Sequence, residues 1–232
     1  MKTLEVTTLN VEVEKNKLLD NITFELTSGK ITALVGHNGA GKSTLMKAIL
    51  GIMEKTAGHI IVNEKYDLNE QFLEFKKLIS YLPEEPLLLT ELTVMQHFQL
   101  YGMSYGLAEA ALSKRVKHYV QNFELNDKLD EYPESLSKGM RQKVQTICAM
   151  LPNTPIILID EPYMGLDIYA VDYFEEVMRE KANNGASILL TTHQLDRVKH
   201  IADEYLMLQQ GELLSKGPIA DFQTIQRRSK DE

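Results

Sequence analysis

The sequence predicts an α/β protein with a mostly parallel sheet, an N-terminal antiparallel β-layer and a helical insert. Short apolar runs of strand length alternate with helical patterns along most of the chain. Two strands of alternating polarity precede the first of these runs, and an all-helical stretch interrupts the alternation between residues 86 and 151. Strands that alternate with helices form a mostly parallel sheet covered on both faces, because each crossover helix packs back onto the sheet.

The N-terminal layer is predicted from two runs in which apolar and polar residues alternate. The first run extends from Leu9 to Val13 and the second from Ile22 to Leu26. The polar residues 15–17 are typical of a turn between two strands, and Ser28-Gly29 is typical of a second turn. We expect these strands to form a small antiparallel layer beside the loop that follows.

A glycine-rich loop follows the apolar strand 31–35 and opens a helix that Gly51 ends. Residues 36–43 match the phosphate-binding pattern G-x-x-x-x-G-K-[ST] without departure, which predicts a P-loop NTPase core. Glycines let backbone N–H groups converge on phosphate oxygens, and the helix adds its positive N-terminal end. Lys42 can reach the β- and γ-phosphates, and the Ser43 hydroxyl can bind Mg²⁺. The residues expected to hold the nucleotide are Gly36, His37, Asn38, Gly39, Ala40, Gly41, Lys42, Ser43 and Thr44.

The helical insert is predicted after a strand at 60–62, a helix at 70–77 and a strand at 79–82. Thr93 and Gln96 have the spacing of a capping box, which predicts a helix from 94 to 105. An apolar stripe between Leu112 and Phe123 predicts a second helix, and Ser137 is a suitable N-cap for a third that extends to residue 151. The apolar run 86–89 lies in a predicted loop, where it packs either into the chain's own core or onto a partner.

Two adjacent carboxylates, Asp160 and Glu161, follow the apolar strand 156–159. Ligands of parallel sheets bind at the carboxyl ends of the strands, so both side chains should face the phosphate loop. Asp160 suits a Mg²⁺ ligand, and Glu161 suits the polarisation of a water that attacks the γ-phosphate. The remaining elements are predicted as a helix at 169–182, a strand at 187–190, a helix at 195–201 and strands at 205–208 and 212–214.

We therefore expect a single domain that spans residues 1–232. Residues 1–85 and 152–218 form the nucleotide-binding core with its β-layer, residues 86–151 form the helical subdomain, and the charged tail 219–232 is expected to fray.

The composition argues against several other classes of protein. A net charge of −8, from 25 basic and 33 acidic residues, provides no broad footprint for nucleic acid. The chain shows no apolar run of bilayer-spanning length and no signal-peptide pattern at its start. Cys148 is the single cysteine, which excludes an intrachain disulfide and is consistent with a reducing compartment. These observations indicate a cytosolic protein.

Five motifs together resemble the ATP-binding subunits of ABC transporters. They are GHNGAGKST, LSKGM at 136–140, ILIDEP at 157–162, GLD at 165–167 and TTH at 191–193, in the order and at the spacing of that family. The variant at 137–143 and the PEEP segment at 83–86 are similar to bacterial export ATPases that work with ABC-2-like or Ecs-type membrane proteins.

The resemblance implies an ATPase that uses ATP and Mg²⁺ and dimerises head-to-tail, as a homodimer or heterodimer, with two ATP molecules between the subunits. It implies that Ser137, Lys138 and Gly139 act on the ATP of the partner and that Asp167 couples the two sites. It also implies that His193 contacts the γ-phosphate.

The sequence departs from the family pattern at a few positions. Lys138 and Met140 replace the usual Gly and Gln, and Met164 replaces a small residue. Glu84 stands where a Gln usually binds Mg²⁺, and a carboxylate oxygen can serve as well. Val13 stands where an aromatic residue usually stacks on adenine. Since no departure removes a phosphate-binding, metal-binding or water-activating group, we expect an active ATPase.

Three classes of function account for these residues to different extents. The first is the motor subunit of an exporter, held at the inner face of the cell membrane by separate membrane subunits. The second is an ABC ATPase that acts on a ribosome or on DNA, although such relatives usually carry tandem halves, long coiled-coil inserts or basic arms. The third, a small-molecule kinase, leaves the LSKGM segment and His193 unexplained. The exporter is the favoured prediction. Its substrate is determined by another chain.

Overall fold

The computed structural model describes residues 1–222 and contains two sheets. The six-stranded sheet has the order β10-β9-β3-β8-β7-β6, and all its neighbouring strands are parallel except β9 and β10. The four-stranded sheet has the order β2-β1-β4-β5 and is antiparallel. The predicted fold class is confirmed. The strands are β1 (Lys2–Val13), β2 (Asn16–Thr27), β3 (Ile31–Val35), β4 (Ala57–Val62), β5 (Tyr66–Asp67), β6 (Ile79–Leu82), β7 (Ile156–Asp160), β8 (Ser187–Thr191), β9 (Glu204–Gln209) and β10 (Glu212–Pro218).

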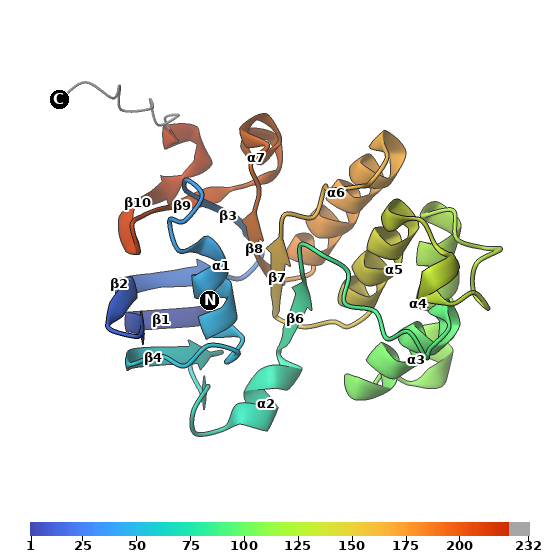
Figure 1. Cartoon of the computed structure of the whole chain (residues 1–232), viewed down its shortest axis with the longest axis horizontal. Helices are drawn as coiled ribbons and strands as arrows, with labels where there is room; N and C mark the ends of the chain where they lie inside the picture. The colour runs from blue at the N-terminus through green and yellow to red at the C-terminus, as the bar shows by residue number, and fades with distance from the viewer. Residues whose placement is uncertain (223–232) are drawn as a thin grey trace.

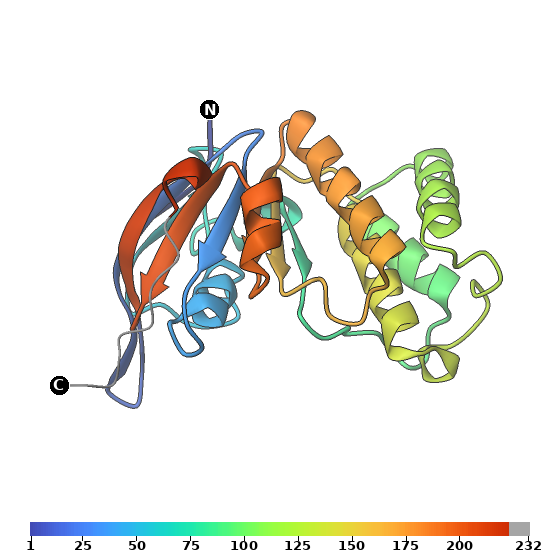
Figure 2. The same cartoon turned by 90° about the horizontal axis from the view of Figure 1, so that it is seen from above.

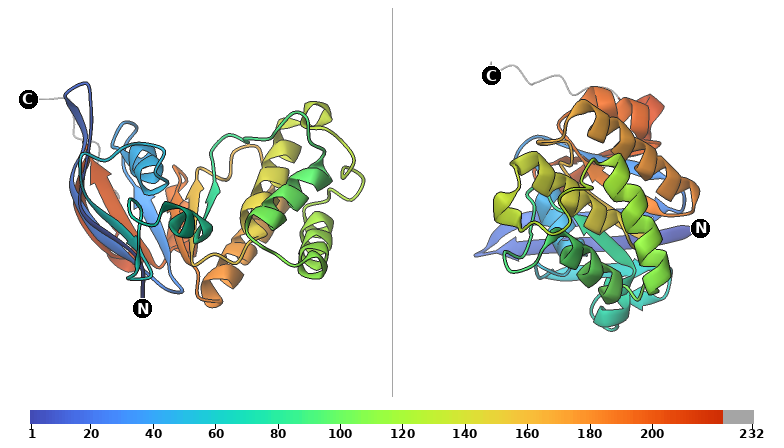
Figure 3. Two further views of the ribbon diagram at one scale, coloured as in Figure 1. Left: turned by 90° about the horizontal axis from the view of Figure 1, so that it is seen from below. Right: turned by 90° about the vertical axis from the view of Figure 1, so that its right-hand side faces the viewer.

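The helices lie mostly on one side of the six-stranded sheet and at one end of the molecule (Figure 1). Seen from above or below, the antiparallel strands and the helices α3 to α5 occupy opposite ends, with the parallel strands between them (Figures 2 and 3). Among residues 1–222, no helix combines the length and the apolar character needed to cross a bilayer. The helices are α1 (Lys42–Ile49), α2 (Phe72–Lys77), α3 (Val94–Ser104), α4 (Glu109–Asn122), α5 (Lys138–Met150), α6 (Ile168–Asn183) and α7 (Leu195–Ile201), with short 3-10 turns at Pro133–Ser135 and Ile219–Asp221.

The six-stranded sheet is buried on both faces because successive residues of each strand face two different cores. In β7, Ile157 and Ile159 belong to the core that contains α3 to α7, whereas Ile156 and Leu158 belong to the core that contains α1 and the antiparallel sheet. This double burial explains why the parallel strands are short continuous apolar runs. It also presents the carboxyl ends of β3, β7 and β8 at one edge of the sheet.

The helical insert begins and is stabilised as its caps predict. Thr93 accepts a hydrogen bond from the backbone N–H of Gln96, and the Gln96 side chain accepts one from Thr93 N at 2.8 Å. The Ser137 hydroxyl accepts a hydrogen bond from Met140 N at 3.2 Å and so caps α5. Packing into the chain's own core is seen for one residue of the apolar run before α3, because Leu88 packs against the core whereas Leu87 is 70% exposed and Leu89 51% exposed.

The first two strands are longer than predicted. Alternation breaks between Val6 and Leu9, where the pairing of β1 with β2 shifts register and Thr8 has a left-handed backbone. A bulge of this kind inserts an extra residue, so the apolar positions before and after it no longer alternate in one regular pattern. The alternation of polar and apolar residues therefore does not reveal the first half of the strand. The two-residue strand β5 and the 3-10 turns carry too little pattern for prediction. The predicted tail falls partly on residues 223–232, which lie outside the described residues.

Candidate nucleotide site

The phosphate loop joins β3 to α1 and depends on glycines at two positions. Gly41 has a φ of 106°, and a Cβ there would approach the Leu19 side chain to 2.9 Å. A Cβ on Gly36 would come within 2.5 Å of the carbonyl oxygen of Leu208 in β9, so the loop can leave the sheet only without a side chain there. Ala40 is buried, whereas His37, Asn38 and Gly39 are exposed and accessible to a ligand.

Lys42 lies buried in the first turn of α1 and faces the two predicted carboxylates. Its ammonium donates to the carbonyl oxygens of Gly36 at 2.8 Å and His37 at 3.3 Å. Burial lowers the pKa of Lys42, and the charges of Glu161 and Asp160 oppose this shift. The lysine is therefore a desolvated cation held over the loop by carbonyl oxygens that compete weakly with phosphate.

Asp160 is the last residue of β7 and is almost fully buried. It lies opposite Thr191 in the parallel pairing with β8, and the Thr191 hydroxyl donates to Asp160 Oδ1. The same hydroxyl oxygen accepts a hydrogen bond from the backbone N–H of Glu161 at 3.1 Å. Thr191 thereby orients both predicted carboxylate residues, a role that its place in the TTH motif alone did not reveal.

Glu161 turns away from the strand and meets His193. Its φ of 45° is left-handed, which is uncommon for a residue with a side chain and occurs often at functional sites. One carboxylate oxygen accepts from His193 N at 3.1 Å, and the other lies 3.2 Å from His193 Nε2. Burial raises the pKa of Glu161 above its usual range, against the opposing effects of His193 and Lys42. A carboxylate with a raised pKa is suited to accept a proton from water.

A cavity of about 520 Å³ contains most of the predicted phosphate, metal and catalytic residues. Three of its side chains, Ser43, Glu84 and Asp160, offer the oxygen ligands that Mg²⁺ prefers. No group of three or more His, Cys, Asp or Glu side chains assembles a complete metal site within residues 1–222. The residues present fit Mg²⁺ bound through one or two carboxylates, a hydroxyl and the phosphates of the nucleotide, which is its usual mode. The cavity is lined by Leu18, Asn38, Gly39, Gly41, Lys42, Ser43, Thr44, Glu84, Asp160, Glu161 and His193.

The predicted LSKGM residues lie apart from this cavity, at the N-terminus of α5. Gly139 packs against the GLD loop so closely that a Cβ on it would clash with the carbonyl oxygen of Gly165. Asp167 caps α6 by accepting from Ala170 N at 2.9 Å, and its carboxylate lies 2.7 Å from the ammonium of Lys143 in α5. The LSKGM and GLD segments thus pack against each other within the chain. Lys143 was not singled out by the sequence analysis. Its position in the predicted helix, six residues after the N-cap Ser137, could have indicated that it lies close to the LSKGM segment.

Val13 does not line the cavity. It lies at the end of β1, 45% exposed, and Leu18 on the neighbouring strand lines the cavity instead. The β1–β2 hairpin pairs Val13 with Asn16 and Glu12 with Lys17, which places Leu18 one residue further along the returning strand. The adenine contact of Val13 remains a prediction, and Leu18 is an apolar residue of the cavity wall that the sequence did not single out.

The order of the parallel strands, the loop between β3 and α1, and the carboxylates after β7 define a P-loop NTPase. The chain belongs to the ABC transporter family, whose model matches residues 19–164. It is therefore an ATPase of the ATP-binding cassette class.

Two curated relatives come from Bacillus subtilis (strain 168). The ABC-type transporter ATP-binding protein EcsA is 36% identical over 96% of this chain and 90% of its own length. The uncharacterized ABC transporter ATP-binding protein YthP is 35% identical over 90% of this chain and 84% of its own length. A solved structure of an ATP-binding subunit of an ABC transporter has a TM-score of 0.91 and 39% identity, and covers 94% of this chain and 91% of its own.

Proposed function

We propose that this chain is the ATP-hydrolysing motor of a bacterial exporter and that two ATPase subunits associate head-to-tail around two ATP–Mg²⁺ complexes. The observation that carries the proposal is the separation of the site into two parts. The phosphate loop and Glu161 line one cavity in the core, whereas Ser137 and Gly139 stand at the start of α5, outside that cavity. Each part completes a site only when it faces the other part on a second subunit.

In such a dimer the residues of the cavity divide the chemistry among themselves. The loop N–H groups and Lys42 bind the phosphates, and the lysine exchanges the carbonyl oxygens of Gly36 and His37 for phosphate oxygens. Ser43, Asp160 and Glu84 would hold Mg²⁺, which neutralises charge on the phosphates when it is bound. Glu161 orients the attacking water and accepts its proton, and His193 leaves the Glu161 carboxylate to contact the γ-phosphate.

Mixing two inactive proteins tests the shared site. Ser137→Arg protein keeps an intact phosphate loop, and Lys42→Ala protein keeps an intact α5 N-terminus, so their heterodimer contains one complete site while each homodimer contains none. We expect part of the ATPase activity to return on mixing. Absence of recovery, once crosslinking has shown that heterodimers form, would contradict the head-to-tail arrangement.

Exposed apolar side chains at the junction of core and insert support a separate membrane subunit as the partner. They come from the segment after α1, from α2, from the segment after β6 and from α3. The Tyr105 hydroxyl donates to Ile79 O at 2.7 Å, which ties the end of α3 to the start of β6 beside α2. In Figure 1, α2 and α3 lie on the same lower side of the molecule. We call this group the junction surface; it consists of Ile52, Phe72, Leu73, Leu87, Leu89 and Met103.

The junction surface suits an apolar or amphipathic segment of an integral-membrane subunit, which would hold the motor at the inner face of the cell membrane. Export is favoured over import by the resemblance of the segments at 83–86 and 137–143 to bacterial export ATPases. Tagged protein purified from membranes should therefore retain an integral-membrane partner, and recovery of ribosomes or nucleic acid in its place would favour the second class of function.

A further inference from the structure

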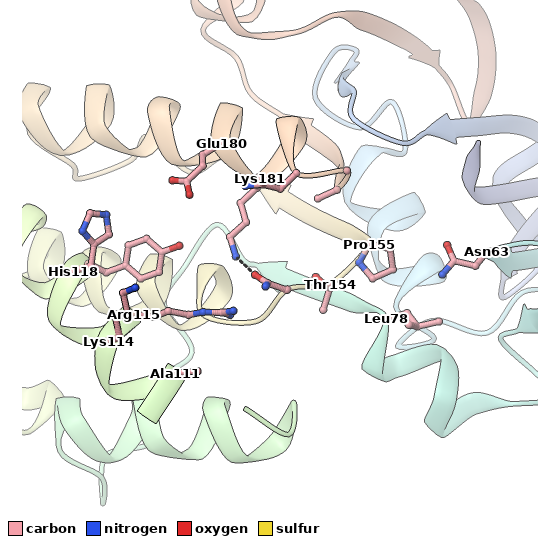
Figure 4. A pocket seen from close by; sticks show the side chains of 15 residues that line it. Asn63, Leu78, Ala111, Lys114, Arg115, His118, Thr154, Pro155, Glu180 and Lys181 are labelled. Atoms are coloured by element: carbon pink, nitrogen blue, oxygen red, sulfur yellow. Dashed lines mark hydrogen bonds between the residues drawn. The ribbon is translucent and has the colours of Figure 1, made fainter. Parts of the chain in front are cut away.

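A second cavity, of about 890 Å³, lies between α4 and α6 at the edge of the parallel sheet opposite the nucleotide site (Figure 4). Its floor is made by the loops 153–155 and 184–186, which precede β7 and β8. Asp160, in contrast, is the last residue of β7, and His193 follows β8. The two cavities share no lining residue.

Four basic side chains line this second cavity, which we call the basic cavity. Lys114, Arg115 and His118 come from α4, and Lys181 comes from α6. Figure 4 shows Arg115 and Lys181 extending from the two helices toward the loop that carries Thr154. Such a concentration of positive charge stands out in a chain whose net charge is −8.

The positive charge of the basic cavity is not balanced by ion pairs. Within residues 1–222, no carboxylate lies within 4.0 Å of Lys114, Arg115 or Lys181. Among the described residues, Glu180 is the one carboxylate residue that lines the cavity. Burial, and then the nearby Arg115, lowers the pKa of Lys181 to about 8. Two cations are therefore held close together on a partly desolvated wall, an arrangement that an anion would relieve.

Capping of α5 accounts for only part of this arrangement. Arg115 donates from Nη1 to the carbonyl oxygen of Leu151, and Lys181 donates to Pro152 O at 2.8 Å and to Asn153 Oδ1 at 3.1 Å. These bonds satisfy carbonyl groups that follow the last turn of α5. They use one of the five guanidinium donors, and they leave Lys114 unexplained at the same cavity, where the His118 ring packs edge-on against Tyr173 of α6.

We propose that the basic cavity is a second ligand site, which binds a small soluble molecule carrying a multivalent phosphate group. The volume lies within the range of small-molecule sites, and the donor set matches phosphate oxygens. Because the wall is built from α4 of the insert and from loops of the core, a bound anion would hold these two parts together. The site is independent of the nucleotide chemistry proposed above.

Titration calorimetry with inorganic tripolyphosphate, in Lys42→Ala protein and without Mg²⁺, tests the site while the phosphate loop is weakened. Arg115→Gln and Lys181→Gln should each reduce the affinity at least about tenfold, since each removes a charge-assisted hydrogen bond. Lys114→Gln should weaken binding severalfold. Lys117 is also an exposed lysine on α4 but does not line the cavity, and Lys117→Gln should leave the affinity unchanged.

Glu180→Gln supplies a test that loss of folding cannot imitate, because removal of the carboxylate that lines the cavity should tighten binding. Equal affinities for the Lys114, Lys117 and Glu180 variants, or no binding by the Lys42→Ala protein, would overturn the proposal. Flotation with vesicles that contain phosphatidic acid separates the two sources of phosphate. Flotation that depends on Lys114 would replace the soluble ligand with a lipid headgroup, and absence of flotation supports the soluble ligand.

Discussion

Several separate interactions fix the position of the Glu161 carboxylate. Its left-handed backbone, the two hydrogen bonds that its N–H donates toward Thr191, and the contact with His193 hold the carboxylate beside Lys42. The backbone conformation belongs to the end of β7, whereas Thr191 and His193 belong to the end of β8, so the position of the carboxylate depends on the register of β7 against β8.

The first prediction concerns this base. Glu161→Gln should bind ATP with nearly unchanged affinity while turnover falls by about 10²–10⁴-fold, the usual contribution of a positioned base. Since burial raises the pKa of Glu161 above 4.5, protonation should reduce the turnover of the wild type as the pH falls, with the midpoint above that value. Steady-state ATPase rates against pH, with equilibrium binding of a fluorescent ATP analogue, measure both. Full activity of the variant would remove Glu161 from the mechanism.

A second prediction concerns the adenine contact at Val13. Stacking of a base on an aromatic side chain is worth about 1–3 kcal/mol in nucleic-acid binders, and valine offers no π surface. We therefore expect poor discrimination between ATP and GTP in the wild type. Val13→Tyr should tighten ATP binding by up to about tenfold for each 1.4 kcal/mol regained. Competition between the two nucleotides measures this effect. Strong ATP preference that Val13→Tyr leaves unchanged would place the base elsewhere, with Leu18 as the first alternative.

At the scale of elements, the N-termini of α5 and α6 pack together as one unit. Gly139 rests on the carbonyl oxygen of Gly165, and Lys143 pairs with the residue that caps α6. A side chain at position 139 would clash with the carbonyl oxygen of Gly165 in the GLD loop, which explains the glycine there.

Asp167 allows its two roles to be separated by substitution. Asp167→Asn keeps a good N-cap but removes the ion pair between Asp167 and Lys143. Because the Asp167 side chain is half-exposed, this loss should lower the free energy of unfolding by at most about 1 kcal/mol. Asp167→Ala should cost a further 0.5–2 kcal/mol, roughly the value of a lost cap. Urea unfolding at pH 7 measures both changes.

The stability difference between the wild type and Asp167→Asn should depend on pH, because the pKa of Asp167 differs between the folded and unfolded states. In the folded state the hydrogen bond from Lys143, and then that from the N–H of Ala170, hold this pKa below its ordinary value of 3.8. A carboxylate with a lowered pKa stabilises the fold above its ordinary value and loses that contribution as the pH falls through its folded pKa. The difference between the wild type and Asp167→Asn should therefore persist down to pH 3.8 and narrow below it. A difference that already vanishes at pH 5 would contradict the assigned ion pair.

At the scale of the whole molecule, the exposed apolar side chains of the junction surface belong to neither hydrophobic core. Leu87→Asp and Met103→Asp, both at residues that are 70% exposed, should not disturb either core. They should abolish recovery of the protein with membranes while the ATPase activity of the purified protein stays intact. Leu214→Asp on β10, another exposed apolar residue, is the matched control. Equal loss in all three variants would indicate general insolubility rather than a docking surface.

The sequence predicted the local elements and most of the chemistry because both depend on short-range pattern. The phosphate loop follows from the spacing of its glycines, Lys42 and Ser43, and the starts of α3 and α5 follow from side chains that bond three residues ahead. The parallel sheet follows from the alternation of strands and helices. The same logic failed for the first half of β1, where a bulge breaks the period at Thr8.

By itself, therefore, the sequence determined the class of fold, and it predicted which residues bind phosphate and which residue activates water. Only the tertiary structure decided which residues from distant segments become neighbours. Leu18 rather than Val13 lines the nucleotide cavity because the register of the β1–β2 hairpin orients it there. Arg115 and Lys181, which lie 66 positions apart in the sequence, share a cavity because α4 and α6 flank the same loop. The physical reason is that spacing along the chain encodes contacts within about one helical turn or between adjacent strands, whereas long-range neighbours depend on how whole helices and sheets pack.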